Sequence, residues 1–146
     1  MKLAALFLSC LPAAAFAALG GAPDYGPQPQ QARQPRQQLR AGAVRNAYTV
    51  HESRTEAGTV VREYASDGKV FAVAWDGPVK PDVRRLLGDY YAQYRSAAAE
   101  ERGSHRRAAV DRSGLVVRSH GHLRAFNGLA WLPTALPPGV TPEELQ

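Results

Sequence analysis

Cysteine is almost absent from this sequence, because Cys10 is the only one. It lies in an apolar stretch, Leu3 to Ala14, that follows Met1-Lys2 and precedes the small-x-small pattern Ala15-Phe16-Ala17. A short positive start, an apolar stretch and such a pattern are typical of a secretory signal peptide. We expect cleavage after Ala17, which leaves a mature chain with no disulfide, no thiol nucleophile and no thiolate metal ligand.

A long hydrophobic run is absent as well. The N-terminal apolar stretch has about a dozen residues, whereas a membrane-spanning helix needs roughly 20. Two alternatives stay open: an uncleaved anchor, and a lipoprotein signal in which Phe7-Leu8-Ser9 precedes Cys10, although Phe7 fits that pattern poorly. We expect a signal peptide over residues 1–17, no transmembrane segment in the mature chain, and a periplasmic or extracellular location.

Acidic residues are in the minority: 13 Asp and Glu stand against 18 Lys and Arg, which gives a net charge of +5, and arginine far outnumbers lysine. An exported protein meets lipid headgroups, envelope polysaccharide and other proteins rather than nucleic acid. We therefore expect another exported protein or an anionic envelope polymer as the partner, and no nucleic acid. The alternative is that the small positive net charge only keeps the domain soluble.

Apolar residues are scarce from Ala22 to Arg40, where Pro, Gln and Arg dominate. Such a segment cannot bury enough surface to fold. We predict a disordered Pro/Gln-rich tether over residues 18–43, a single α+β domain over 44–140 and a C-terminal tail over 141–146. That domain is large enough for one core without disulfides.

Three strands are predicted before a helix. They are rich in β-branched and aromatic residues and cover Tyr48–Ser53, Thr59–Ala65 and Val70–Trp75. Asp67-Gly68 predicts a type I′ hairpin turn between the second and the third. Pro78 ends the third strand, because proline cannot donate to a sheet.

One long amphipathic helix is predicted from about Asp82 to Glu101. Pro81-Asp82 suits the first helical turn, and Gly103 suits the stop. Apolar residues recur at helical spacing over about 140° of the helix surface, wide enough to cover a sheet; they are Val83, Leu86, Leu87, Tyr90, Tyr91, Tyr94, Ala97 and Ala98.

The chain after the helix predicts a loop and further strands. The expected segments are a loop at Ser104–Arg107, strands at Gly114–Ser119 and His122–Phe126 with a turn at His120-Gly121, and a bulge or second hairpin at Asn127-Gly128 before Leu129–Leu132. The predicted fold is α+β: an antiparallel sheet of about five or six strands (β-β-β-α-β-β) with the helix on one face. The predicted core residues are Tyr64, Phe71, Val73, Trp75, Leu86, Leu87, Tyr90, Tyr94, Leu115, Val117 and Phe126.

Several short blocks resemble a family of exported proteobacterial proteins, domain of unknown function 2844. The blocks are Ala18–Gly21, Tyr48–Glu52, Gly58–Tyr64, Gly68–Pro78, Pro81-Asp82 with Leu86-Leu87-Gly88, and Arg124-Ala125-Phe126. They cover nearly the whole mature chain, and Val70–Pro78 is the most specific. The resemblance implies export and a single domain, and it implies no catalytic residue.

Motifs for catalysis are missing too. No G-x-S-x-G nucleophile motif and no Gly-rich phosphate loop follows a strand. Glu52, Glu56 and Glu63 fall on strand or turn positions where we expect solvent rather than a cleft. We therefore expect no catalytic residue and no cofactor.

His120 and His122 form the best metal candidate. Residues i and i+2 of a strand point to one face, so two imidazoles could share an ion. A third ligand would come from His51, His105, Glu52 or Asp111. The alternative is an exposed hairpin tip, because Gly121 also fits a turn.

A binding surface is predicted on one flank of the helix, where Arg84, Gly88, Tyr91 and Arg95 lie within roughly 60° of each other. Two guanidinium groups beside an aromatic ring, with a gap at Gly88, could hold an anionic or planar group. The alternative is that the arginine stems lie over the apolar stripe and Gly88 only lets a strand or loop approach.

For function, three classes stay open. The first is a non-catalytic exported binding or assembly accessory protein. The second is a structural accessory that docks on another exported protein through a sheet edge or the tether. The third is a metal-dependent or hydrolytic enzyme, which elemental analysis of the purified protein would test in its metal form.

Overall fold

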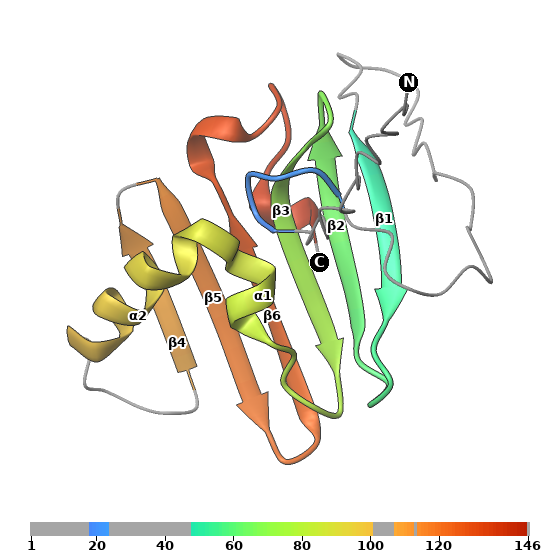
Figure 1. Ribbon diagram of the computed structural model, residues 1–146, viewed down its shortest axis with the longest axis vertical. Coiled ribbons are helices and arrows are strands. Elements are labelled where there is room, and N and C mark those ends of the chain that lie inside the picture. Colours follow the sequence, from blue (N-terminus) through green and yellow to red (C-terminus); the bar gives the residue numbers. More distant parts are fainter. Residues whose placement is uncertain (1–17, 24–47, 101–106, 113, 146) are drawn as a thin grey trace, which may run out of the picture.

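The computed structural model describes residues 18–23, 48–100, 107–112 and 114–145 of the chain (Figure 1). The predicted signal peptide, most of the predicted tether, and His105 lie outside the described residues.

Six antiparallel strands form one open sheet in the order β1-β2-β3-β6-β5-β4. Their bounds are β1 Thr49–Arg54, β2 Val60–Ser66, β3 Lys69–Gly77, β4 Arg107–Arg112, β5 Leu115–His122 and β6 Ala125–Trp131. The predicted α+β class is confirmed. The predicted pattern β-β-β-α-β-β lacked one strand, since three strands follow the helical segment.

The first three strands follow the sequence pattern closely. Asp67 and Gly68 both have positive φ, 51° and 75°, as a type I′ turn requires. Nearly every residue from Val70 to Trp75 is buried, because β3 lies inside the sheet between β2 and β6.

The helical segment is interrupted. It consists of α1 (Val83–Leu87), a 3-10 turn η1 (Gly88–Tyr90) and α2 (Tyr91–Glu100). Gly88 has φ 51° and ψ −122°, a conformation that side chains strongly disfavour. The predicted helix is confirmed as one helical segment of 18 residues, Val83 to Glu100, and the regular course that we expected is interrupted by the 3-10 turn that begins at Gly88. Neither helix, among the described residues, is long and apolar enough to cross a membrane.

The second half of the sheet differs from the prediction in three places. Asn127 and Gly128, where we expected a bulge or a second hairpin, lie inside the unbroken strand β6. β4 begins at Arg107, which we had assigned to a loop, and pairs with β5. β5 continues through His120 and Gly121 to His122, and the chain turns instead at Leu123-Arg124, where Arg124 has φ 66°. Gly121 serves the sheet: a Cβ there would lie 2.7 Å from the ring of Phe126 on β6.

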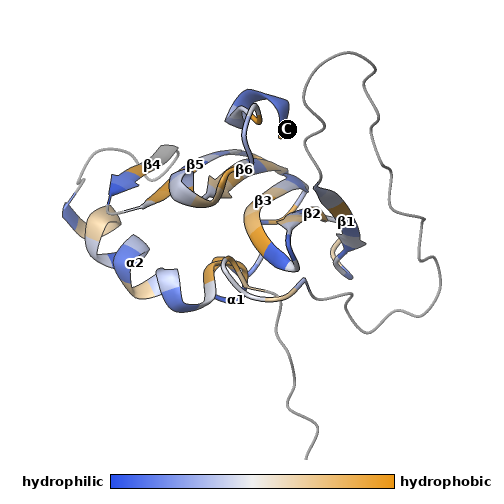
Figure 2. Cartoon of the chain, turned by 90° about the horizontal axis from the view of Figure 1, so that it is seen from above, coloured by the Kyte–Doolittle hydropathy of each residue, from blue (hydrophilic) through white to orange (hydrophobic). Residues whose placement is uncertain are grey.

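Other segments of the chain pack on both faces of the sheet (Figure 2). On one face, which we term the helix face, α1 and α2 pack on Val61, Val73, Trp75 and Val117. On the other face, the tail face, the C-terminal segment packs on Tyr64, Phe71 and Trp131 through the residues Leu136, Val140 and Leu145. The predicted core is buried apart from Tyr90 and Phe126, which are half-buried.

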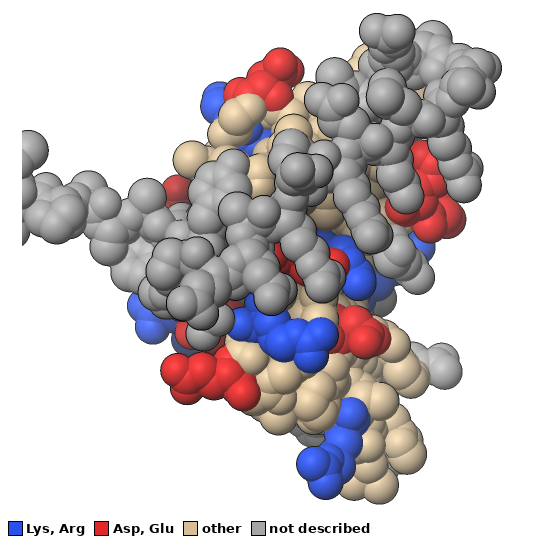
Figure 3. Space-filling model, turned by 90° about the vertical axis from the view of Figure 1, so that its right-hand side faces the viewer, with Lys and Arg blue, Asp and Glu red and all other residues tan. Residues whose placement is uncertain are grey.

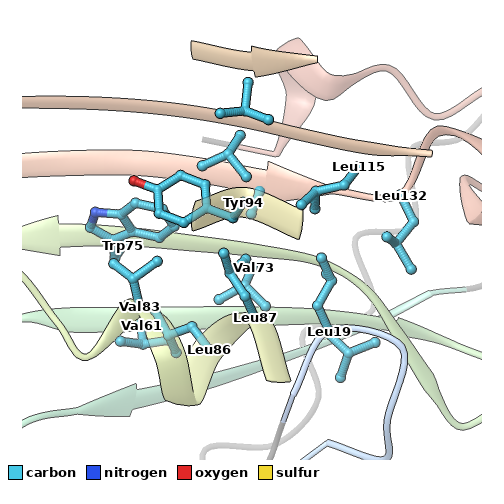
Figure 4. Close-up of a cluster of buried hydrophobic side chains, with 14 of the residues drawn as sticks. Leu19, Val61, Val73, Trp75, Val83, Leu86, Leu87, Tyr94, Leu115 and Leu132 are labelled. Atoms are coloured by element: carbon cyan, nitrogen blue, oxygen red, sulfur yellow. The ribbon is translucent and has the colours of Figure 1, made fainter. Parts of the chain in front are cut away.

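The two ends of the described chain enter these cores. Leu19 is 2% exposed and lies with Leu86, Leu87 and Leu132 (Figure 4). Backbone hydrogen bonds fix the segment: Leu19 N donates to Leu86 O at 3.0 Å, and Gly20 N to Val70 O at 2.8 Å. Leu145 is fully buried on the tail face. The sequence analysis had placed these residues in the tether and in the tail.

Candidate functional site

The four residues of the predicted helix flank do not lie on one continuous helix. Arg84 belongs to α1, Gly88 to the interruption, and Tyr91 and Arg95 to α2. The position that a Cβ of Gly88 would take is occupied by the side chain of Ala18. The gap at Gly88 therefore holds the protein's own N-terminal segment, which is the alternative that the sequence analysis left open.

The remaining members of that flank have different environments. Arg84 and Arg95 are exposed, whereas Tyr91 packs against the helix-face core with its ring 6.3 Å from that of Tyr94. Burial, with Tyr91 adding to it, raises the pKa of Tyr94, so Tyr94 is neutral at physiological pH. Binding by this set stays a prediction.

His120 and His122 are both exposed on β5 and share the tail face of the sheet. Asn127 and Arg107 lie opposite His120, and Ala125 lies opposite His122. None of these three neighbours is a carboxylate, an imidazole or a thiolate. Within the described parts of the chain no group of three His, Cys, Asp or Glu residues is placed to hold a metal ion. A metal at the histidine pair stays a prediction.

Glu63 is the residue that sequence reasoning misplaced. We expected it to be solvated, but it is 5% exposed on the helix face, opposite His51 of β1. Thr49 Oγ1 lies 3.1 Å from His51 Nε2, and partial burial lowers the pKa of His51. The alternation of β2 carried the signal, because Glu63 follows buried Val61 at a spacing of two residues.

Trp75 is a second buried polar group. Its side chain lies over Gly128 of β6, where a Cβ would collide with the indole ring. The residue is 2% exposed, and its Nε1 has no hydrogen-bond partner among the residues that the structure describes. A donor of this kind is usually satisfied by an ordered water.

Exposed apolar side chains occur at one end of the sheet. In the described ranges Val79 at 49% and Leu123 at 86% are the large hydrophobic residues left exposed. The loop after β3 carries Val79 and the β5–β6 turn carries Leu123, and both lie at the lower end in Figure 1. The register agrees, since Gly77 at the end of β3 pairs with Phe126 near that turn.

Each of these apolar residues has an exposed basic neighbour, Lys80 beside Val79 and Arg124 beside Leu123. We term the surface made by Val79, Lys80, His122, Leu123 and Arg124 the apolar–basic end. In Figure 3 the lowest tip of the molecule shows basic and uncharged atoms. The sequence analysis did not select this surface, because a single Leu or Val in a loop carries no pattern.

The loop that carries Val79 is held in place. Thr59 is 1% exposed, and its hydroxyl donates to Val79 O at 2.6 Å. Val79 N in turn donates to the hydroxyl oxygen of Thr59 at 3.4 Å. Gly77 has no room for a side chain, because Thr59 occupies that space. Hydrogen bonds to a buried threonine therefore hold the backbone of Val79 in the position where its side chain is exposed.

Comparison with known proteins gives one match. The model of a family described as protein of unknown function (DUF2844) matches residues 15–145. No curated protein and no solved structure matches the chain.

Proposed function

The chain belongs to the DUF2844 family, and we propose that it is a non-catalytic exported accessory protein that binds its partner through the apolar–basic end. The observation that carries the proposal is the exposure of Val79 and Leu123 together with Lys80 and Arg124. Each of the two exposed apolar side chains lies beside a cation at the same end of the sheet, and this is the surface that we propose for binding.

The packing on the two faces of the sheet supports a binding surface at the apolar–basic end. The helix face is covered by α1, α2 and the segment Ala18–Gly21, and the tail face carries the C-terminal segment. Both faces thus contribute to the fold of the protein itself. A partner is then expected at an end or an edge of the sheet.

Export is supported by the sequence of residues 1–17. Cleavage after Ala17 would keep the buried Leu19 in the mature chain. The proposed location is the periplasm or the extracellular space.

The open sheet favours a second candidate, a structural accessory that docks on another exported protein through an edge strand. The edges are β1 and β4. The end of β4 is engaged by α2, because Gln93 Nε2 donates to Arg112 O at 2.6 Å and Glu100 pairs with Arg112 at 2.6 Å. Among the described residues, β1 is then the edge that we propose for pairing.

Affinity capture from the exported fraction tests both candidates. The purified protein, whose N-terminus should be Ala18, is immobilised beside a Val79→Ser/Leu123→Ser variant and a matched control, Ala92→Ser/Ala135→Ser, at exposed positions elsewhere. We expect a partner that the wild type and the control retain and the first variant loses. Loss only with Glu52→Pro in β1, whose N–H faces the open edge, would favour the edge-strand candidate, and equal retention by every variant would contradict the proposal.

A further inference from the structure

Resting on the proposed function, we infer that the partner of the apolar–basic end is an anionic phospholipid bilayer. Leu123 and Val79 would enter the headgroup region, and Lys80 and Arg124 would contact lipid phosphates. Such a contact is peripheral and needs no membrane-spanning segment.

The arrangement of the apolar residues favours a fluid partner. Leu123 stands on a two-residue turn between β5 and β6, while Val79 stands on a separate loop after β3. They are two separate tips with polar chain between them, whereas a protein-binding patch is usually continuous and well packed. A lipid surface can accept each tip independently. A hydrated polysaccharide would gain nothing from either side chain, because it offers no apolar phase.

The charges at this end complement an anionic surface. The described segments 54–59, 76–85 and 120–125, which comprise the loops at this end and the adjoining ends of strands and of α1, contain five basic residues and three acidic ones. They are Arg54, Lys80, Arg84, Arg85 and Arg124 against Glu56, Asp76 and Asp82. The balance at this end is therefore positive by two charges. One or two apolar side chains give weak attachment, so the cations supply the second signal that stable binding needs.

The tips are held in the exposed position before any partner arrives. Thr59 fixes the backbone of Val79 from inside the fold. At the other tip, Arg124 has a positive φ of 66°, which a residue with a side chain adopts at a cost. The backbone of both tips is thus defined before binding, which lowers the entropy that binding would cost.

Vesicle co-sedimentation tests the inference with the purified mature chain. Two sets of vesicles are used: phosphatidylcholine alone, and an equal mixture of phosphatidylcholine and phosphatidylglycerol. We expect binding to the mixed vesicles, much weaker binding to the neutral ones, and loss of binding with added salt. Leu123→Ser should reduce partitioning about tenfold, since a buried leucine is replaced by a polar group.

Further variants separate the contribution of the apolar side chains from that of the cations. Lys80→Gln/Arg124→Gln should abolish the preference for phosphatidylglycerol, whereas Arg95→Gln, which removes an exposed cation from α2, should leave it unchanged. Thermal unfolding of each variant checks that the fold is intact. We expect it to be, because all the substituted side chains are exposed. Equal binding to both kinds of vesicle, or unchanged binding of the Val79→Ser/Leu123→Ser variant, would overturn the inference.

Failure of the inference and failure of the proposed function give different results. Without vesicle binding, capture of an exported protein through Val79 and Leu123 would overturn the lipid partner and keep the accessory function. Absence of both vesicle binding and such capture would overturn both.

Discussion

Gly88 and Ala18 lie far apart in the sequence but share one space in the fold. Gly88 leaves its Cβ position to the side chain of Ala18, and its backbone turns there with a positive φ. The same exchange occurs in the sheet, where Gly128 makes room for Trp75 and Gly121 for Phe126. In each case a glycine removes its own side chain so that another can be buried.

The first prediction follows from this contact. Gly88→Ala should lower the free energy of unfolding by about 2–5 kcal/mol, because it adds both backbone strain and a collision with Ala18. Gly68→Ala is the matched control, since Gly68 also has positive φ but has nothing within 4 Å of its Cβ position. It should cost only about 1–2 kcal/mol. Urea titration of tryptophan fluorescence measures both, and equal losses would contradict the role of Ala18.

Predictions for single residues were right where the contacting residue is near in the sequence and wrong where it is far away. Asp67 and Gly68 adopt the expected turn because the requirement lies within those two residues. The role of Gly88 could not be deduced, because its partner is a segment that looked like the start of a tether. The burial of Glu63 was missed for a different reason: a carboxylate was assumed to be solvated although the strand alternation placed it inside.

At the scale of elements, α1 depends on its N-terminus. The helix has only five residues, so few of its backbone N–H groups are satisfied internally. Asp82 compensates by accepting hydrogen bonds from Arg84 N at 3.0 Å and Arg85 N at 3.2 Å. This cap also sets where the chain leaves the loop that carries Val79 and Lys80.

Asp82→Ala should therefore lower the free energy of unfolding by about 1 kcal/mol, since two backbone donors lose their acceptor. Asp82→Asn keeps an oxygen in the same place and should cost only a few tenths of a kcal/mol. Thermal or urea unfolding distinguishes them. A loss with asparagine as large as that with alanine would mean that the negative charge, rather than the hydrogen bonds, stabilises the helix start.

The strands were predictable to different degrees. β2 and β3 were found because both are rich in β-branched and aromatic residues. β4 was missed because Arg107-Ala108-Ala109-Val110-Asp111-Arg112 has one strong β-former among small and charged residues. Its strand state comes from pairing with β5. The β5–β6 turn was misplaced because Gly121 has the composition of a turn, although the ring of Phe126 is what requires a glycine there.

For the whole molecule, the central feature is that each end of the described chain packs into the core on one face of the sheet, Leu19 on the helix face and Leu145 on the tail face. Sequence patterns predicted the helix on one face, since its apolar stripe is local and periodic. They did not predict the tail on the other face, because Leu136, Val140 and Leu145 stand among prolines without any period. The apolar–basic end was hidden for the same reason, as it forms only when two loops reach one end of the sheet.

The closing prediction concerns these two ends. Leu19→Ala and Leu145→Ala should each lower the free energy of unfolding by about 2–5 kcal/mol, because both side chains are buried and each leaves a cavity. Leu123→Ala is the matched control: the residue is 86% exposed, and its replacement should change stability by about 0.5 kcal/mol or less.

Leu19→Val and Leu145→Val are smaller changes that keep the domain folded. Their losses in free energy of unfolding should add in the double variant, since the two residues lie in clusters on opposite faces of the sheet. Urea titrations of the single and double variants provide the comparison. A coupling energy above about 0.5 kcal/mol would show that the two ends stabilise one shared core instead of two separate ones.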